Sequence, residues 1–380
     1  MGGNNKLARE GLIVLCLAIS VQTLVAESAG FRHRPPAMYV LGDSILDVGN
    51  NNYLPGADVP RSNRPYYGID FPGRMPTGRF SNGYNTADYI AKSMGFLSSP
   101  PPYLSLLALN SSIALAPTAL TTGVSYASAN AGILDSTNAG TCIPLSTQVE
   151  YFNATRAQMV SAVGSRAVQS HLSDSIFLVD GGSNDLFVFA AANRSAADQQ
   201  SDAAALFADL ISNYSATITE LYAMGARKLA IINVGLVGCV PAVRARNAAG
   251  ACADGLNQLA AGFNDALRSL LADELAQGLP GLVYSLADSF LLTQDTFADP
   301  EASGYTDIAG ACCGGGRLLA EADCLPNSTI CASREARDQH VFWDRYHPAQ
   351  RACFLTAQAF YNGPAKYTTP INFMQLAQSS

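Results

Sequence analysis

Five short apolar runs, separated by longer stretches, constrain the fold of this 380-residue chain more than any other feature. Most of them lack the polar–apolar alternation of a strand with one face in water, which is typical of parallel strands buried on both faces. The sequence therefore predicts a mainly parallel five-stranded sheet. Its strands are expected at residues 37–42, 123–128, 175–182, 228–235 and 281–288.

Two segments between these runs have apolar residues at three- and four-residue spacing, which predicts amphipathic helices. Residues 201–225 stop at a glycine, and residues 253–280 stop at a glycine and a proline, as helices commonly do. Because strands alternate with helices, we expect right-handed crossovers and an α/β fold of three layers, α/β/α. No internal repeat or low-complexity linker interrupts the chain, so residues 37–365 are predicted to form a single domain.

The N-terminal residues 1–26 have the pattern of a signal peptide. Lys6 and Arg9 precede an apolar stretch that runs to about residue 25, and small residues follow it, which predicts cleavage near Ala26. The alternative is an uncleaved anchor, although the uninterrupted apolar part is shorter than the ~18 residues of a membrane span. No later segment predicts a span, so the cleaved protein is expected to have no stable membrane anchor.

Entry into the secretory pathway predicts disulfide bonds. Eight cysteines remain if Cys16 leaves with the signal, and their spacing favours a bridge between Cys239 and Cys252 and two bridges within residues 312–331. A zinc site made by the four cysteines of that segment is the alternative, which the secretory route and the lack of a histidine among them disfavour. The eight cysteines are Cys142, Cys239, Cys252, Cys312, Cys313, Cys324, Cys331 and Cys353.

The net charge and the glycosylation sequons give further indications of the partners and the location of this protein. The net charge of −7 argues against a nucleic-acid partner, which needs a basic face, and leaves neutral substrates such as sugars or lipids. Secretion would make each N-x-S/T sequon a candidate glycosylation site on the surface. The sequons begin at Asn110, Asn153, Asn193, Asn213 and Asn327.

The first predicted strand ends in Gly-Asp-Ser, and this places Ser44 at the carboxyl end of a parallel strand, where ligands of open α/β sheets bind. Taken alone, Ser44 would more simply be a helix N-cap. A serine nucleophile needs a base and a group that orients the base. His347 follows Asp344 by three residues, so one loop could supply both. His340 is expected to be a packed or surface residue.

A second strand end, Gly-Gly-Ser-Asn-Asp at residues 181–185, offers the side-chain amide of Asn184. An amide donor of this kind can stabilise the negative charge that develops during acyl transfer. The motifs G-x-S-x-G, Walker A and H-E-x-x-H are absent from the sequence, so neither an α/β-hydrolase elbow nor a zinc protease is indicated. Serine chemistry without a metal or organic cofactor is the expectation.

With these residues identified, nearly the whole mature chain resembles the plant GDSL esterase/lipase family of the SGNH hydrolase superfamily. The motifs that carry the likeness lie in the family's order: "YVLGDSILDVGNNN", "RPYYGIDFPGRMPTGRFSNGYNTADYIA", "IFLVDGGSNDLF", "NVGLVGCVP", "ACCGGG" and "FWDRYHPAQ". The resemblance implies a flavodoxin-like SGNH hydrolase fold and ester hydrolysis. It also implies that Ser44 is the nucleophile and a backbone oxyanion donor, Asn184 the oxyanion side chain, His347 the base and Asp344 its partner.

One motif departs from the family. Where the family usually has "ASGGAG", this chain has "ASANAG", with Asn130 in place of a glycine whose N–H helps hold the oxyanion. A backbone donor does not require glycine, and asparagine tolerates left-handed backbone, so Asn130 is expected to keep the donor. Its side chain would stand beside the reacting carbonyl, and our hypothesis is that it narrows the acyl site towards groups such as acetyl.

The substrate is the open part of this prediction. The sequence indicates a secretory-pathway serine esterase, placed outside the cell, in the cell wall or in the Golgi lumen. The Tyr-, Arg- and Asn-rich loop of residues 50–85 favours sugar hydroxyls, and with it the acetyl esters of a cell-wall polysaccharide such as xylan, unless the loop is only a structural rim. A lipase or general carboxylesterase acting on acyl lipids is the alternative. A non-catalytic carbohydrate-binding relative is the rival from another class, and the oligomeric state is not predicted.

Overall fold

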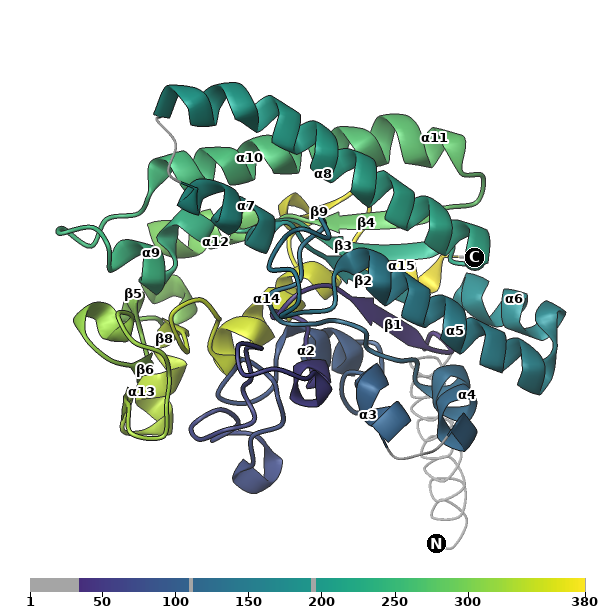
Figure 1. Ribbon diagram of the computed structural model, residues 1–380, viewed down its shortest axis with the longest axis horizontal. Helices are drawn as coiled ribbons and strands as arrows, with labels where there is room; N and C mark the ends of the chain where they lie inside the picture. Colours follow the sequence, from purple (N-terminus) through teal and green to yellow (C-terminus); the bar gives the residue numbers. More distant parts are fainter. Residues whose placement is uncertain (1–33, 109–111, 193–195, 380) are drawn as a thin grey trace, which may run out of the picture. The chain divides into compact units, whose positions relative to one another are not determined.

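A five-stranded sheet lies at the centre of the computed structural model, which describes residues 34–108, 112–192 and 196–379 (Figure 1). The first four strands are parallel, with Met38 opposite Ile176 and Lys228 opposite Val283, and the last is antiparallel to its neighbour. This confirms the predicted α/β class and the mainly parallel sheet. In order across the sheet the strands are β1 (Met38–Leu41), β2 (Ile176–Asp180), β3 (Lys228–Ile232), β4 (Val283–Ala287) and β9 (Thr368–Thr369).

One predicted strand is not part of this sheet. Residues 123–128 run beside β1, where Val40 N–H donates to Val124 O (3.1 Å) and Tyr126 N–H donates to Val40 O (2.7 Å). The N–H of Ser125 points to the other side and donates to Pro101 O (2.9 Å), and the segment forms isolated bridges instead of a regular strand. The fifth strand is β9, which is two residues long and therefore carries no apolar run that could predict it.

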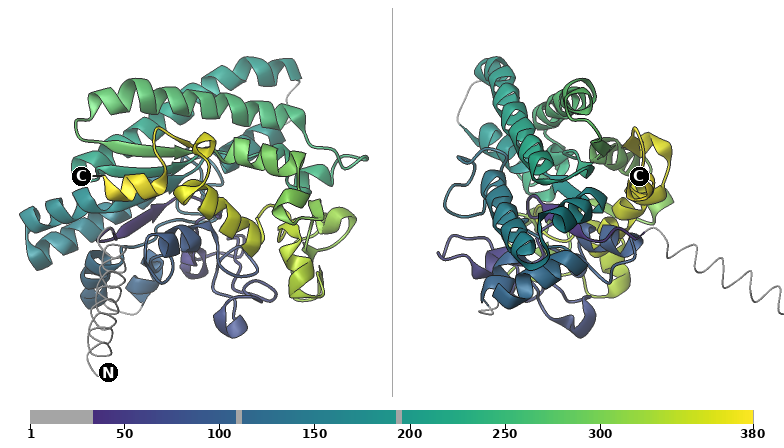
Figure 2. Two further views of the ribbon diagram at one scale, coloured as in Figure 1. Left: turned by 180° about the vertical axis from the view of Figure 1, so that it is seen from behind. Right: turned by 90° about the vertical axis from the view of Figure 1, so that its right-hand side faces the viewer.

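Helices cover both faces of the sheet (Figure 2). One face packs against α5 (Leu145–Val163), α6 (Ser165–Asp174), α8 (Ala196–Met224) and α10 (Asp254–Ser269), the other against α2 (Thr86–Ser93), α14 (Gln350–Asn362) and α15 (Phe373–Gln378). This is the predicted three-layer arrangement. The remaining α-helices of the described chain are α3 (Tyr103–Ala108), α4 (Ser112–Thr121), α7 (Ser183–Ala191), α9 (Pro241–Arg244), α11 (Ala276–Gly278), α12 (Ser289–Ala298) and α13 (Arg334–Asp338).

Both long helices were predicted, and their details follow from local sequence. α8 ends before Gly225, whose φ of 124° lies in the region that favours glycine. The helix predicted over 253–280 begins as α10 and continues to Gly278 through a π-helical turn at Leu270–Leu275. That turn buries leucine side chains in the core of this face of the sheet.

Three disulfides staple the outer segments, as predicted. Cys239 is bonded to Cys252, Cys312 to Cys331 and Cys313 to Cys324, and Cys142 and Cys353 are free. Two of these disulfides lie within residues 307–342, the stapled segment, which contains two short sheets. In them β5 (Asp307–Ala311) pairs with β8 (His340–Phe342), and β6 (Cys313–Gly314) pairs with β7 (Thr329–Ile330).

Some predictions concern residues that the structure does not describe. The predicted signal peptide at 1–26 and the sequons at Asn110 and Asn193 lie outside the described residues. The other sequon asparagines, Asn153, Asn213 and Asn327, are exposed. Within the described part of the chain, every helix is either too short or too polar to span a bilayer.

Candidate active site

The turn after β1 holds Ser44 at the end of the sheet. Gly42 has a φ of 148°, and a Cβ there would overlap the carboxylate of Asp180 at the end of β2. Gln148 of α5 binds both sides of Gly42, accepting from its N–H (2.8 Å) and donating to its carbonyl (2.9 Å). Asp43 N–H donates to Asp180 Oδ1 (2.9 Å). The backbone that carries Ser44 is therefore fixed by side chains from two neighbouring elements.

The loop between β8 and α14 brings Asp344 and His347 to Ser44. His347 Nε2 lies 2.9 Å from Ser44 Oγ, and His347 Nδ1 lies 2.8 and 2.9 Å from the two carboxylate oxygens of Asp344. Trp343 N–H donates to His347 O (2.8 Å), which closes the loop. A hydroxyl, an imidazole and a carboxylate in this order are the arrangement that nucleophilic catalysis by serine requires.

Asp344 is buried yet kept ionised. Burial alone would raise its pKa, but the charge and hydrogen bond of His347, the Tyr346 N–H and the Tyr67 hydroxyl outweigh burial and hold the pKa below its usual value. The carboxylate therefore stays negative and can hold the imidazole in the tautomer whose Nε2 accepts a proton from serine.

A second pair of carboxyl groups lies directly behind Ser44. Burial raises the pKa of Asp43 and of Asp180, and the charge of Asp43 raises that of Asp180 further. The pair therefore resists carrying two negative charges. Asp43 Oδ1 accepts from Ile45 N–H (2.9 Å), so this residue helps to fix the turn that carries Ser44.

Three groups near Ser44 could donate to an oxyanion. Asn184 lies at the start of α7, and its Nδ2 donates to Ala131 O at 2.9 Å, with Asp43 Oδ2 at 3.4 Å. Asn130 has a φ of 70°, the left-handed conformation anticipated for it. In residues 34–108, 112–192 and 196–379, no protein group accepts a hydrogen bond from the N–H of Ser44 or of Asn130. Both N–H groups are thus available to a ligand.

A cleft of about 760 Å³ opens from these residues. Near Ser44 its lining is polar and includes Asn130, Asn184 and His347. Its lining also comes from α7, α9, α12 and the segment from β8 to α14, where apolar side chains lie among polar ones such as Thr293, Asp295 and Arg246. The apolar lining includes Phe187, Val188, Val237, Val243, Leu292, Phe297, Phe342 and Leu355.

The comparisons with known proteins decide the family. A sequence model of the GDSL-like lipase/acylhydrolase family matches residues 38–360. The chain belongs to this family. GDSL esterase/lipase At5g55050 of Arabidopsis thaliana is 38% identical over 352 residues, which cover 90% of each chain. GDSL esterase/lipase At1g71250, from the same plant, is 35% identical over 375 residues, covering 96% of this chain and 95% of the relative. Membership makes this chain a hydrolase of carboxylic esters.

Two aromatic residues of this GDSL-family protein contact the Asp344 and His347 side chains although the sequence did not point to them. Tyr67 donates to Asp344 Oδ2 (2.7 Å), and the ring of Phe80 lies 4.7 Å from that of His347. Both come from the long loop of residues 50–85, whose lack of periodicity was the one signal of a functional role. Within the described residues, the cleft has no lining side chain from this loop.

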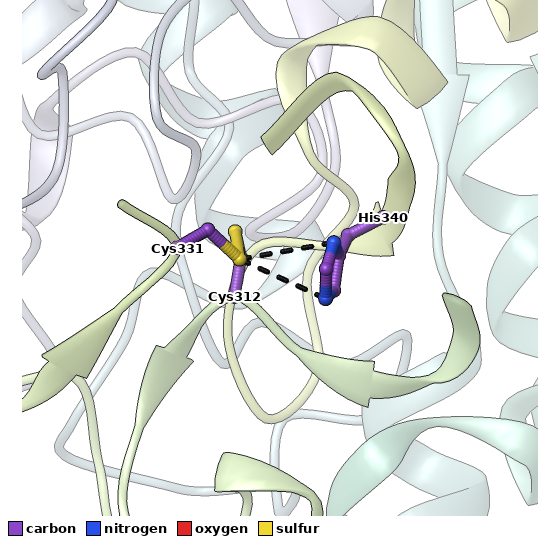
Figure 3. A group of neighbouring side chains, drawn as sticks. All are labelled: Cys312, Cys331 and His340. Carbon is purple, nitrogen blue, oxygen red and sulfur yellow. Dashed lines mark hydrogen bonds between the residues drawn. A yellow bond between two sulfur atoms is a disulfide. The ribbon is translucent and has the colours of Figure 1, made fainter. Parts of the chain in front are cut away.

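The alternative zinc site can be judged from the side chains. Cys312, Cys331 and His340 lie together, with both ring nitrogens of His340 3.7 Å from Cys331 Sγ (Figure 3). Both sulfurs belong to one disulfide, and a disulfide lacks the thiolates that bind zinc. His340 is half-buried and contacts Ala336 O (2.8 Å).

Proposed function

We propose that this GDSL-family hydrolase is a secretory-pathway serine esterase in which Ser44, His347 and Asp344 act as a triad. The observation that carries the proposal is the 2.9 Å separation of Ser44 Oγ and His347 Nε2 at the mouth of the cleft. His347 takes the serine proton as Oγ attacks the ester carbonyl, and it returns that proton to the departing alkoxide. Water then repeats the sequence on the acyl-enzyme and releases the acid.

Negative charge develops on the carbonyl oxygen at each of these steps. In the proposal the N–H groups of Ser44 and Asn130 and the amide of Asn184 stabilise it. The amide must leave or share its contact with Ala131 O when substrate binds, since that contact is 2.9 Å long. No metal or organic cofactor takes part in the proposed reaction.

We propose acyl lipids as the substrate class, because apolar surface outweighs polar surface in the cleft and suits an acyl chain better than a sugar. Apolar side chains such as Phe187, Val237 and Phe297 offer no hydrogen bonds to sugar hydroxyls. Some polar groups of the loop that favoured a polysaccharide are bound to another segment of the protein. Arg64 and Tyr66 donate to the carbonyls of Cys324 and Pro326, for example.

Deacetylation of a polysaccharide such as xylan is the second candidate. Asn130 lines the cleft beside Ser44, and this supports the hypothesis of a narrow acyl site. The three disulfides and the exposed sequons at Asn153, Asn213 and Asn327 support passage through the secretory pathway. A purely carbohydrate-binding role would leave the contact between Ser44 and His347 without a use.

A fluorophosphonate probe tests the enzyme class. Wild type should be labelled and Ser44→Ala should not, and labelling of both would contradict the proposed nucleophile. Substrate class is tested by incubating both proteins with triacylglycerol and with acetylated xylan, and measuring the fatty acid and acetate released. We expect fatty acid release by wild type. Acetate alone would favour the second candidate.

A further inference from the structure

Tyr67 makes a contact with the active-site carboxylate that the sequence did not reveal. Its hydroxyl donates to Asp344 Oδ2 at 2.7 Å, and both side chains are buried. The other oxygen, Oδ1, accepts from the N–H groups of Tyr346 and His347, each at 2.9 Å. His347 Nδ1 lies near both oxygens. Apart from His347, Tyr67 is thus the one donor seen on Oδ2 within the described chain.

The surroundings of Tyr67 hold its hydroxyl in place. Its ring lies edge-on to Phe80 and Trp343, with centroids 5.9 and 6.5 Å away, and Arg64 lies over it at 5.8 Å. Phe80 in turn packs against His347, so one aromatic cluster touches both the acid and the base.

The loop that carries Tyr67 is tied to the stapled segment. Arg64 Nε donates to Cys324 O (3.1 Å), and Arg337 forms two contacts of 2.6 Å with the carboxylate of Asp70. These links lie on both sides of Tyr67 in the chain. The loop is therefore built as a support that reaches the triad from behind, away from the cleft.

We propose that Tyr67 is a positioning residue of the triad: its hydroxyl fixes the rotation of the Asp344 carboxylate and thereby the imidazole of His347. The proposal rests on the triad of the proposed function. Without the hydroxyl, Oδ2 is buried with only His347 as a donor, and the backbone N–H groups hold the rotation of the carboxylate from Oδ1 alone. The positive end of the hydroxyl dipole also no longer offsets the carboxylate charge, so His347 holds a proton more tightly.

Other charges near these two side chains must stay constant in a test. On the loop of the triad, Arg345 faces Asp344. The remaining charged groups come from three other elements: Arg64 and Asp323 face Tyr67, and Asp43 faces His347. A change confined to the hydroxyl leaves all of these in place, which makes Tyr67→Phe the informative variant.

Tyr66→Phe is a matched control, because the Tyr66 hydroxyl donates to Pro326 O (2.7 Å) on the surface. The assay is hydrolysis of a soluble chromogenic ester by the whole protein between pH 5 and 9. We expect Tyr67→Phe to lower kcat by roughly ten- to a hundredfold, the typical worth of a hydrogen bond to a charged group, with KM unchanged. The acidic limb of the kcat profile should move to higher pH. Tyr66→Phe should match wild type.

A double-mutant cycle separates positioning from a loss of folding. If Tyr67 acts through Asp344, adding Tyr67→Phe to Asp344→Asn should cost little further activity. An unchanged pH profile in Tyr67→Phe, or equal and additive losses in the cycle, would overturn the proposal and leave the triad intact. If wild type itself hydrolyses no ester and takes no fluorophosphonate label, the proposed function fails instead.

Discussion

His347 Nε2 lies 2.9 Å from Ser44 Oγ although 303 residues separate the two in the chain. Ser44 follows the first strand of the sheet, and His347 precedes helix α14, which packs against α2. The distance between these two side chains therefore depends on how α14 packs against the sheet and α2.

Removing the side chain of Asn184 should slow the chemical step. We expect Asn184→Ala to lower kcat by roughly 100- to 1000-fold, the usual cost of losing one oxyanion donor, with a much smaller change in KM. Steady-state kinetics on a soluble ester measure this. Ser183→Ala is the control, since Ser183 also lines the cleft but takes no part in the proposed reaction. Equal effects of the two changes would contradict the assignment.

Filling the apolar part of the cleft should slow the hydrolysis of esters with long acyl chains and leave that of short esters nearly unchanged. Val243 of α9 lines this part, and a tryptophan there would fill space that an acyl tail occupies in our proposal. Loss of burial for two methylene groups costs about tenfold in kcat/KM. We therefore expect Val243→Trp to lower kcat/KM at least about tenfold on a dodecanoyl ester and only slightly on an acetyl ester. Leu97→Trp, at a position 94% exposed, is the control.

Asn130 distinguishes the two candidate substrates. If acyl chains lie along α7 and α12, other residues line the space that they occupy. Asn130→Gly should then leave the ratio of rates on acetyl and octanoyl esters unchanged. Competition between the two esters gives this ratio directly. A marked gain on the octanoyl ester would show that the Asn130 side chain limits the acyl site, as the acetyl hypothesis holds.

Asp47 should make stability depend on pH. Burial raises its pKa from 3.8 to about 6, although it accepts from the N–H groups of Gly49, Asn50 and Ala129. Because the folded state then binds the proton more tightly, the contribution of Asp47 to the free energy of unfolding falls as pH rises through that window, by roughly 3 kcal/mol. Urea denaturation between pH 4 and 7 should show a flatter dependence for Asp47→Asn. Parallel curves would contradict this.

The ion pair of Asp70 and Arg337 should matter for stability. Their side chains are 7% and 9% exposed, so Asp70→Asn leaves a buried guanidinium without its counter-charge. We expect a loss of about 3–5 kcal/mol, measured as a lower urea midpoint. Asp323→Asn is the matched control. It breaks an ion pair with Arg345 in which Asp323 is 58% exposed, and should cost less than about 1 kcal/mol.

Local sequence was sufficient to predict where the candidate site residues that follow strand ends would lie. Ser44 and Asn184 come directly after β1 and near the end of β2, and Asp344 and His347 lie close together in one loop. Topology alone places the carboxyl ends of parallel strands at one edge. The four parallel strands were likewise predicted from continuous apolar runs, and both long helices from apolar residues at three- and four-residue spacing.

Contacts between irregular segments that lie far apart in the chain could not be predicted from the sequence. The bond from Tyr67 to Asp344 joins residues 277 positions apart, and neither lies in a periodic element. The segment predicted as a strand at 123–128 forms only isolated bridges, to β1 on one side and to Pro102 on the other. Apolar composition reports burial, but it does not say which neighbour receives each backbone hydrogen bond.

The stapled segment has a bearing on how active protein can be produced. Cys313 N–H donates to Trp343 O (2.7 Å), and Cys312 N–H donates to Phe342 O (3.1 Å). The two adjacent half-cystines are thus bonded to the residues that directly precede Asp344. Chains made in a reducing bacterial cytosol would lack these covalent ties beside the triad. Activity per milligram would then measure how completely a preparation has been oxidised, which makes it an assay of maturation as well as of catalysis.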